Sequence, residues 1–69
     1  MPDYPGDHFF VQSIGESLAA DYQEAGQTLN AGSATWFART IWDVVYGGLP
    51  PLESVAKHRR EWREALGLN

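Results

Sequence analysis

The residues that could carry chemistry in this chain are two histidines and nine acidic side chains, and no cysteine is present. Zinc sites and metalloproteases place histidines at helical spacing, as in HxxxH or HExxH, and neither His8 nor His58 belongs to such a pattern. The sequence contains no GxSxG, P-loop or GxGxxG motif, and its carboxylates show no pairing suited to general acid–base catalysis. We therefore expect no enzymatic activity, no metal site and no cofactor, and we interpret both histidines as ordinary surface residues.

The most conspicuous charged feature is the basic tract KHRREWRE, which holds four of the five basic residues of the chain. On a helical wheel this tract divides between two faces. Lys57 and Arg60 share an outer face with glutamates, whereas Arg59 falls within an apolar stripe and Arg63 lies beside it. The stripe is formed by Leu52, Val55, Ala56, Trp62 and Leu66. Binding to nucleic acid usually requires a continuous basic surface, and the whole chain has a formal net charge of −4. We therefore interpret the outer face as solvated and do not favour nucleic acid as a partner.

Three interpretations of Arg59 remain open at this point. Its methylene groups could be buried while its charged head reaches solvent, it could pair with a carboxylate of the same chain, or it could face a partner protein. Asp21 is the natural intramolecular candidate because it falls at the edge of an apolar helical arc. A carboxylate in that position costs free energy unless it is paired.

Three segments with helical hydrophobic periodicity position these residues, and we expect helices over residues 8–25, 34–46 and 51–66. Asp7 and Ser33 are expected to cap the first two helices, because their side-chain oxygens can accept the free amide protons of a first turn. Glycine follows each of the three segments and is expected to end the helix there. The second segment is rich in β-branched and aromatic residues, so a β-strand is the competing interpretation of that segment.

The expected fold is all-α: residues 1–7 form a flexible N-terminal tail, and residues 8–69 form a single helical domain with the architecture of a small three-helix bundle. A chain of 69 residues without disulfides buries only a limited core, so homodimerisation could complete the fold. The expected core residues are Phe10, Ile14, Leu18, Tyr22, Phe37, Ile41, Val45, Val55 and Leu66.

Two aromatic residues fall outside the expected core stripes. Trp36 lies near Arg39 on the helical wheel, away from the apolar side of its helix, and Phe9 is displaced from the apolar arc of the first helix. Both could cover the ends of a small core. Both could instead be anchors for another protein, because aromatic residues and arginine are enriched among the residues that dominate interfaces. The candidate partner-binding residues are accordingly Trp36, Arg39, Arg63 and Phe9.

Together these features favour a small acidic protein-binding regulator or inhibitor that acts by direct protein–protein contact. The analogy, of size and class only, is with phage and mobile-element antagonists of host factors such as anti-CRISPR proteins. A helix-turn-helix DNA-binding regulator built from residues 34–46 and 51–66 is the first alternative, and a structural subunit of a larger assembly is the second. The start of the chain lacks the features of a secretion signal, and no stretch is apolar enough to span a membrane, so we expect a cytoplasmic protein.

Overall fold

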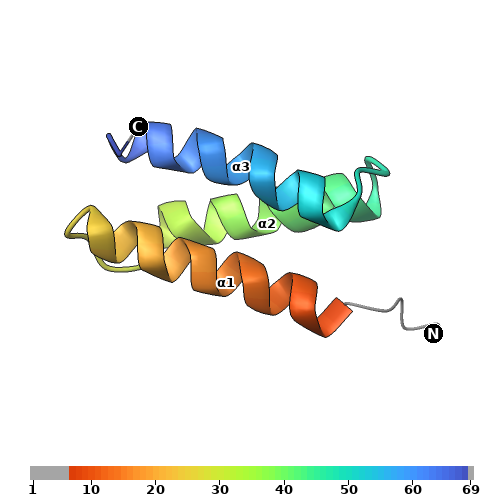
Figure 1. Cartoon of the computed structure of the whole chain (residues 1–69), viewed down its shortest axis with the longest axis horizontal. Helices are drawn as coiled ribbons and strands as arrows, with labels where there is room; N and C mark the ends of the chain where they lie inside the picture. The colour runs from red at the N-terminus through yellow and green to blue at the C-terminus, as the bar shows by residue number, and fades with distance from the viewer. Residues whose placement is uncertain (1–6, 69) are drawn as a thin grey trace.

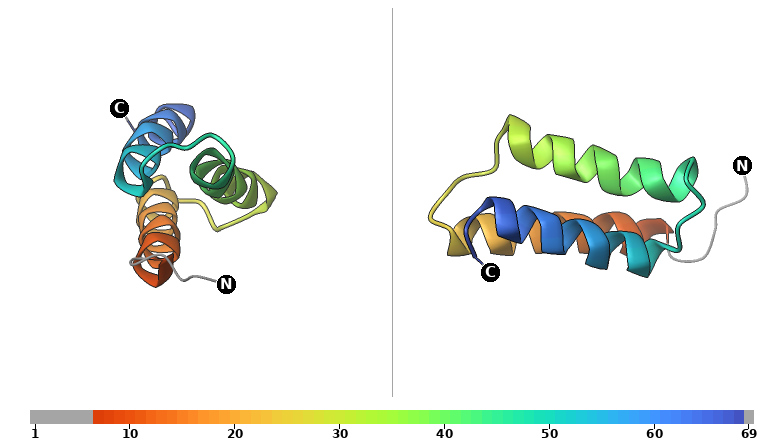
Figure 2. Two further views of the ribbon diagram at one scale, coloured as in Figure 1. Left: turned by 90° about the vertical axis from the view of Figure 1, so that its right-hand side faces the viewer. Right: turned by 90° about the horizontal axis from the view of Figure 1, so that it is seen from above.

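The computed structural model describes residues 7–68 of the chain. Within this part it contains three helices and no strand: α1 (Asp7–Glu24), α2 (Ala31–Val45) and α3 (Pro51–Ala65). The helices lie side by side in alternating directions, and each contacts the other two (Figure 1, Figure 2). The expected all-α three-helix bundle is therefore confirmed, and the strand interpretation of the second segment is wrong.

The ends of the helices follow the expected signals of the sequence. Pro51 occupies the first turn of α3, where its missing N–H would have had no helical partner. Gly26 and Gly48 adopt φ angles of 74° and 73° just beyond α1 and α2, a left-handed conformation that glycine adopts without steric cost. The expected tail at residues 1–7 lies outside the described residues except for the start of α1, and so does the side chain of Asp7, the expected cap.

The start of α2 differs from the expectation. The helix begins at Ala31 rather than at residue 34, and Asn30, not Ser33, is its N-cap. The backbone N–H of Ser33 donates to Asn30 Oδ1 (3.1 Å), and the backbone N–H of Asn30 donates to Ser33 Oγ (2.9 Å). Ser33 therefore supplies the second half of a capping box, a role usually filled by Glu or Gln three residues after the cap. The helix therefore begins three residues earlier than expected.

The core lies along the inner face of α1. The expected residues Phe10, Ile14, Leu18 and Tyr22 are all buried there, and Trp62 of α3 joins them with no exposed surface. The expected residues Phe37, Ile41, Val55 and Leu66 are partly buried and pack against this cluster, as do Trp36 and Val44.

One residue that we expected in the core is exposed. Val45 leaves 59% of its surface exposed, because it lies on the open wall of a groove between α1 and α2. The centre of the core is instead Trp62 of α3, whose fully buried ring contacts Asp21 of α1 and Trp36 of α2. The sequence placed Trp62 in the apolar stripe of this helix but did not single it out as a core residue.

Buried polar side chains, as well as apolar ones, take part in the contact between α2 and α3. Ser54 Oγ donates a 2.8 Å hydrogen bond to the backbone carbonyl of Thr40, and both residues are fully buried. His58 is also buried: Nδ1 lies 2.8 Å from the Ser54 carbonyl oxygen and Nε2 lies 3.0 Å from Asp43 Oδ2. The interpretation of His58 as a surface residue is therefore wrong. Because these polar residues face inward, Leu52 faces solvent and is 82% exposed, although it was expected in the apolar stripe of α3.

Candidate protein-binding surfaces

A buried carboxylate at the contact of α1 with α3 organises the arginines of the basic tract. Asp21 is 1% exposed and accepts hydrogen bonds from Arg59 Nε (3.0 Å) and Nη2 (3.2 Å). It also accepts from Trp62 Nε1 and from Arg63 Nη1, both at 2.6 Å. Burial by itself would raise the pKa of Asp21, but the hydrogen bonds from these three side chains outweigh it and hold the pKa below its ordinary value. We refer to these four residues as the Asp21 cluster.

The Asp21 cluster decides among the three interpretations of Arg59. Arg59 pairs with Asp21 within the chain, and this contact raises the pKa of the Arg59 guanidinium group above its ordinary value. Arg63, which we expected at a partner interface, donates to both Asp21 and Glu24, and its side chain is only 22% exposed. The principal role of both arginines is therefore to join α1 to α3.

Trp36 lies at the edge of the core rather than on the solvent side of α2. It is partly buried, and its ring meets the ring of Trp62 edge-on, with centroids 6.5 Å apart and planes at 61°. The guanidinium group of Arg39 lies over the outer face of the Trp36 ring, 5.2 Å from its centroid. Trp36 therefore covers the end of the core, and the interpretation that places it outside the core is wrong.

The four candidate partner-binding residues do not form one surface. Trp36 and Arg39 are neighbours on α2, as the sequence predicted. Phe9 stands near the start of α1 and is 71% exposed, whereas Arg63 stands near the end of α3. The start of α1 and the end of α3 lie at opposite ends of the bundle (Figure 1).

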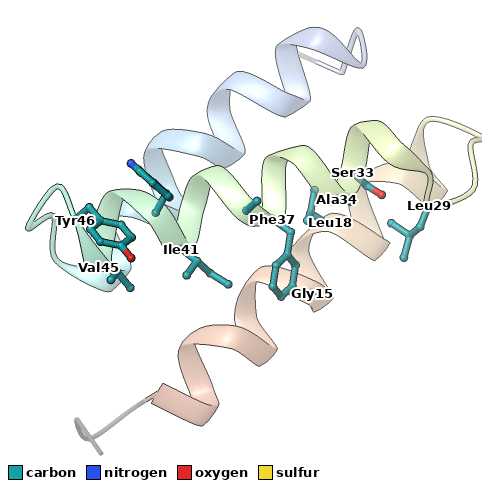
Figure 3. A pocket seen from close by; sticks show the side chains of 11 residues that line it. Gly15, Leu18, Leu29, Ser33, Ala34, Phe37, Ile41, Val45 and Tyr46 are labelled. Atoms are coloured by element: carbon teal, nitrogen blue, oxygen red, sulfur yellow. The ribbon is translucent and has the colours of Figure 1, made fainter. Parts of the chain in front are cut away.

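An apolar groove with a volume of about 740 Å³ lies between α1 and α2, and we call it the α1–α2 groove (Figure 3). No charged side chain lines it. The Phe37 ring extends from α2 across Gly15 of α1 and forms its floor; a Cβ on Gly15 would lie 3.8 Å from that ring. The lining residues are Gly15, Leu18, Leu29, Ser33, Ala34, Phe37, Ala38, Ile41, Trp42, Val45 and Tyr46.

Large apolar side chains on the wall of the α1–α2 groove are open to solvent. Trp42, Val45 and Tyr46 are 62%, 59% and 71% exposed, and Leu29 at the far end is 56% exposed. The rings of Trp42 and Tyr46 pack on each other with centroids 4.3 Å apart. Monomeric proteins rarely leave contiguous apolar surface of this kind uncovered, and where they do it usually marks an interaction site.

A second apolar surface lies between the start of α1 and the start of α3, and we call it the Phe9–Leu52 surface. Its hollow has a volume of about 350 Å³. Phe9 and Leu52 are 71% and 82% exposed at its rim, and Pro50 and Pro51 form part of its wall. It shares no lining residue with the α1–α2 groove. The sequence predicted only Phe9 at this surface, since Leu52 was assigned to the inner stripe of α3.

Neither a metal centre nor a membrane-spanning element stands out in the part of the chain that the structure describes. No three His, Asp or Glu side chains among these residues are grouped so that they could hold a metal ion. None of the three helices combines the length and apolar character required to cross a lipid bilayer. No known family model matches the chain, and neither curated proteins nor solved structures include a significant match.

Proposed function

We propose that this chain is a small acidic regulator or inhibitor that acts by binding another protein directly. The observation that carries the proposal is the Phe9–Leu52 surface, where two of the most exposed large apolar side chains stand on either side of one hollow. Apolar anchors seated in a partner's pocket dominate the affinity of many interfaces. The partner is therefore expected to present a complementary apolar pocket or ridge.

The backbone around this surface supports the role of an anchor site. Pro50 and Pro51 have fixed φ angles, and Pro51 is already part of the first turn of α3. Phe9 stands on α1, so both anchors are carried by helices. A surface held rigid before binding loses little conformational entropy when the complex forms.

The proposal is tested by comparing variants of the two apolar surfaces in cells that naturally produce the chain. Leu52→Ser alters the Phe9–Leu52 surface, and Leu29→Ser makes the same change in the α1–α2 groove. Both side chains are exposed, so both variants are expected to fold, which circular dichroism checks. A partner captured by the wild-type chain should be lost with Leu52→Ser and retained with Leu29→Ser.

The captured protein is then purified and its affinity is measured. Truncation of a central anchor costs about 2 kcal/mol or more, which corresponds to roughly thirtyfold weaker binding. Phe9→Ala should give a loss of similar size. A partner that binds all these variants with equal affinity would contradict the proposal, as would a partner lost only with Leu29→Ser.

The helix-turn-helix alternative fits the geometry less well. In that motif two helices cross at about 90–120°, so that the second can enter the major groove of DNA. Here α2 and α3 run alongside each other in opposite directions (Figure 1, Figure 2). The arginines that would contact DNA are also engaged with Asp21. Tight, salt-sensitive binding of the chain to duplex DNA would favour this alternative instead.

A further inference from the structure

We propose that the α1–α2 groove is the interface of a homodimer, in which α2 of a second copy lies antiparallel to α2 across the groove. This interface does not overlap the Phe9–Leu52 surface, so the homodimer and the partner-binding function can be tested separately. The proposal rests on the shape of the groove, the spacing of its residues and the surface that it leaves uncovered.

The side chains on the wall of the groove change in size along α2. At its start the wall is made of small side chains, including Ser33, Ala34 and Ala38. At its end the wall carries the large pair Trp42 and Tyr46, which project into solvent. A second copy related by a two-fold axis near Ala38 would lay its large end over the small end of the first copy. The groove of one copy is therefore complementary to the groove of a second copy, as the interface of a two-fold dimer requires.

The spacing of the residues by which α2 lines the groove also suits a second helix. Ala34, Ala38, Ile41 and Val45 follow one another at intervals of four, three and four residues. This is the seam along which two helices pack with interlocking side chains. Inside the bundle α1 contacts only one side of this seam, so Val45 remains 59% exposed.

The exposed surface is large enough for a stable contact. Aromatic side chains present about 150–250 Å² each, so the exposed fractions of Trp42 (62%) and Tyr46 (71%) leave roughly 200–330 Å² uncovered in each copy. Two copies would bury roughly twice that area from these residues alone, and a specific interface needs about 1,000 Å² in total. Leu29, Val45 and the rest of the wall supply the remainder.

A second copy explains the groove better than a foreign helix does. No charged side chain lines the groove, so the groove carries no charge pattern that would select a partner of opposite charge. The side chains that need covering are those of Trp42, in the last turn of α2, and of Tyr46, its C-cap, and the small residues able to accept them lie on the same helix. One symmetric contact therefore covers both ends of the groove at once.

The first test measures the mass of the intact chain in solution by sedimentation equilibrium. The wild-type chain should have twice the 7.7 kDa mass of the monomer. Ala38→Lys should give a folded monomer, because Ala38 is exposed in a single copy and two lysines would meet at the two-fold axis. Ala20→Lys, the same change at an exposed position of α1 outside the groove, should remain dimeric.

Several results of this measurement would overturn the proposal. They are a wild-type chain that stays monomeric up to about 1 mM, an assembly larger than a dimer, and an Ala38→Lys variant that remains dimeric. If Ala38→Lys fails to fold, cross-linking of single-cysteine variants tests the proposal instead. These variants carry one cysteine each, because the wild-type chain has none.

The second test fixes the direction of the helices by disulfide formation between single-cysteine variants. Ala38→Cys should form an intermolecular disulfide, because two residues at the axis can come within the roughly 7 Å that a disulfide spans. Ala34→Cys should not, since antiparallel packing separates the two copies of this position by about 12 Å along the helix. Ala20→Cys is the control and should stay reduced. Equal cross-linking of Ala34→Cys would indicate parallel helices and overturn the proposed arrangement.

Discussion

Trp62 Nε1 donates a 2.6 Å hydrogen bond to Asp21 Oδ2, so the fully buried ring at the centre of the core holds the buried carboxylate of α1. Arg59 and Arg63 donate to the same carboxylate from one turn before and one residue after Trp62 on α3. The apolar core and the ion pairs between α1 and α3 are therefore parts of a single contact, and loss of either should weaken the other.

We expect Asp21→Asn to lower the free energy of unfolding by about 2–3 kcal/mol, because hydrogen bonds to a charged group contribute about 1.5–3 kcal/mol each. The loss is limited because the side chains of Arg59 and Arg63 are 45% and 22% exposed and can be hydrated. Urea denaturation measures the difference. Glu24→Gln is the matched control: its carboxylate is 55% exposed, so its loss should cost less than about 1 kcal/mol.

Acid should destabilise the protein through Asp21. Its pKa in the folded chain lies below the ordinary value of 3.8, so the unfolded chain takes up the proton first as the pH falls. The stability that Asp21 contributes is therefore complete above about pH 5 and is lost as the pH falls through the folded pKa. The stability difference between wild type and Asp21→Asn should shrink from pH 7 to pH 3. A difference that stays constant over this range would show that Asp21 has an unshifted pKa.

Trp36→Ala should destabilise the fold by about 2 kcal/mol, less than the 3–5 kcal/mol typical of a fully buried tryptophan. The ring packs edge-on against Trp62 while Arg39 covers its outer face, so its removal opens the end of the core. Thermal and urea denaturation measure the change. Arg39→Ala, which removes only the outer cover, should cost less than about 1 kcal/mol. A Trp36→Ala variant as stable as wild type would return Trp36 to the partner-binding surface.

Removing the cap of α2 should cost about 1 kcal/mol. Asn30→Ala eliminates the acceptor for the Ser33 N–H, and Ser33→Ala eliminates the acceptor for the Asn30 N–H. Because the two residues form one reciprocal capping box, the double variant should lose less than the sum of the single losses. Thr28→Ala, in the same connection but outside the box, serves as the control. Strictly additive losses would indicate that the two hydrogen bonds act independently.

The sequence by itself determined the three helices and the apolar face of α1. Residues such as Ile14 and Leu18 recur at helical spacing, and glycine and proline mark the helix ends, because both signals depend only on the local chain. The need for Asp21 to have a partner was also visible, since a carboxylate at the edge of an apolar arc must be compensated. At the Phe9–Leu52 surface, only the outward position of Phe9 could be predicted.

Only the tertiary structure decided which side of α2 and α3 faces inward. Ser54 and His58 lie at the contact between these helices because Thr40 and Asp43 of α2 satisfy their polar atoms across it, and a helical wheel of α3 alone does not show these partners. Because these polar residues face inward, Leu52 faces outward. Val45 was likewise expected in the core, but α1 covers only one side of α2 and leaves Val45 on the open wall of the groove. Apolar periodicity identifies a face that needs burial, whereas the packing of three helices decides how much of that face one chain can bury.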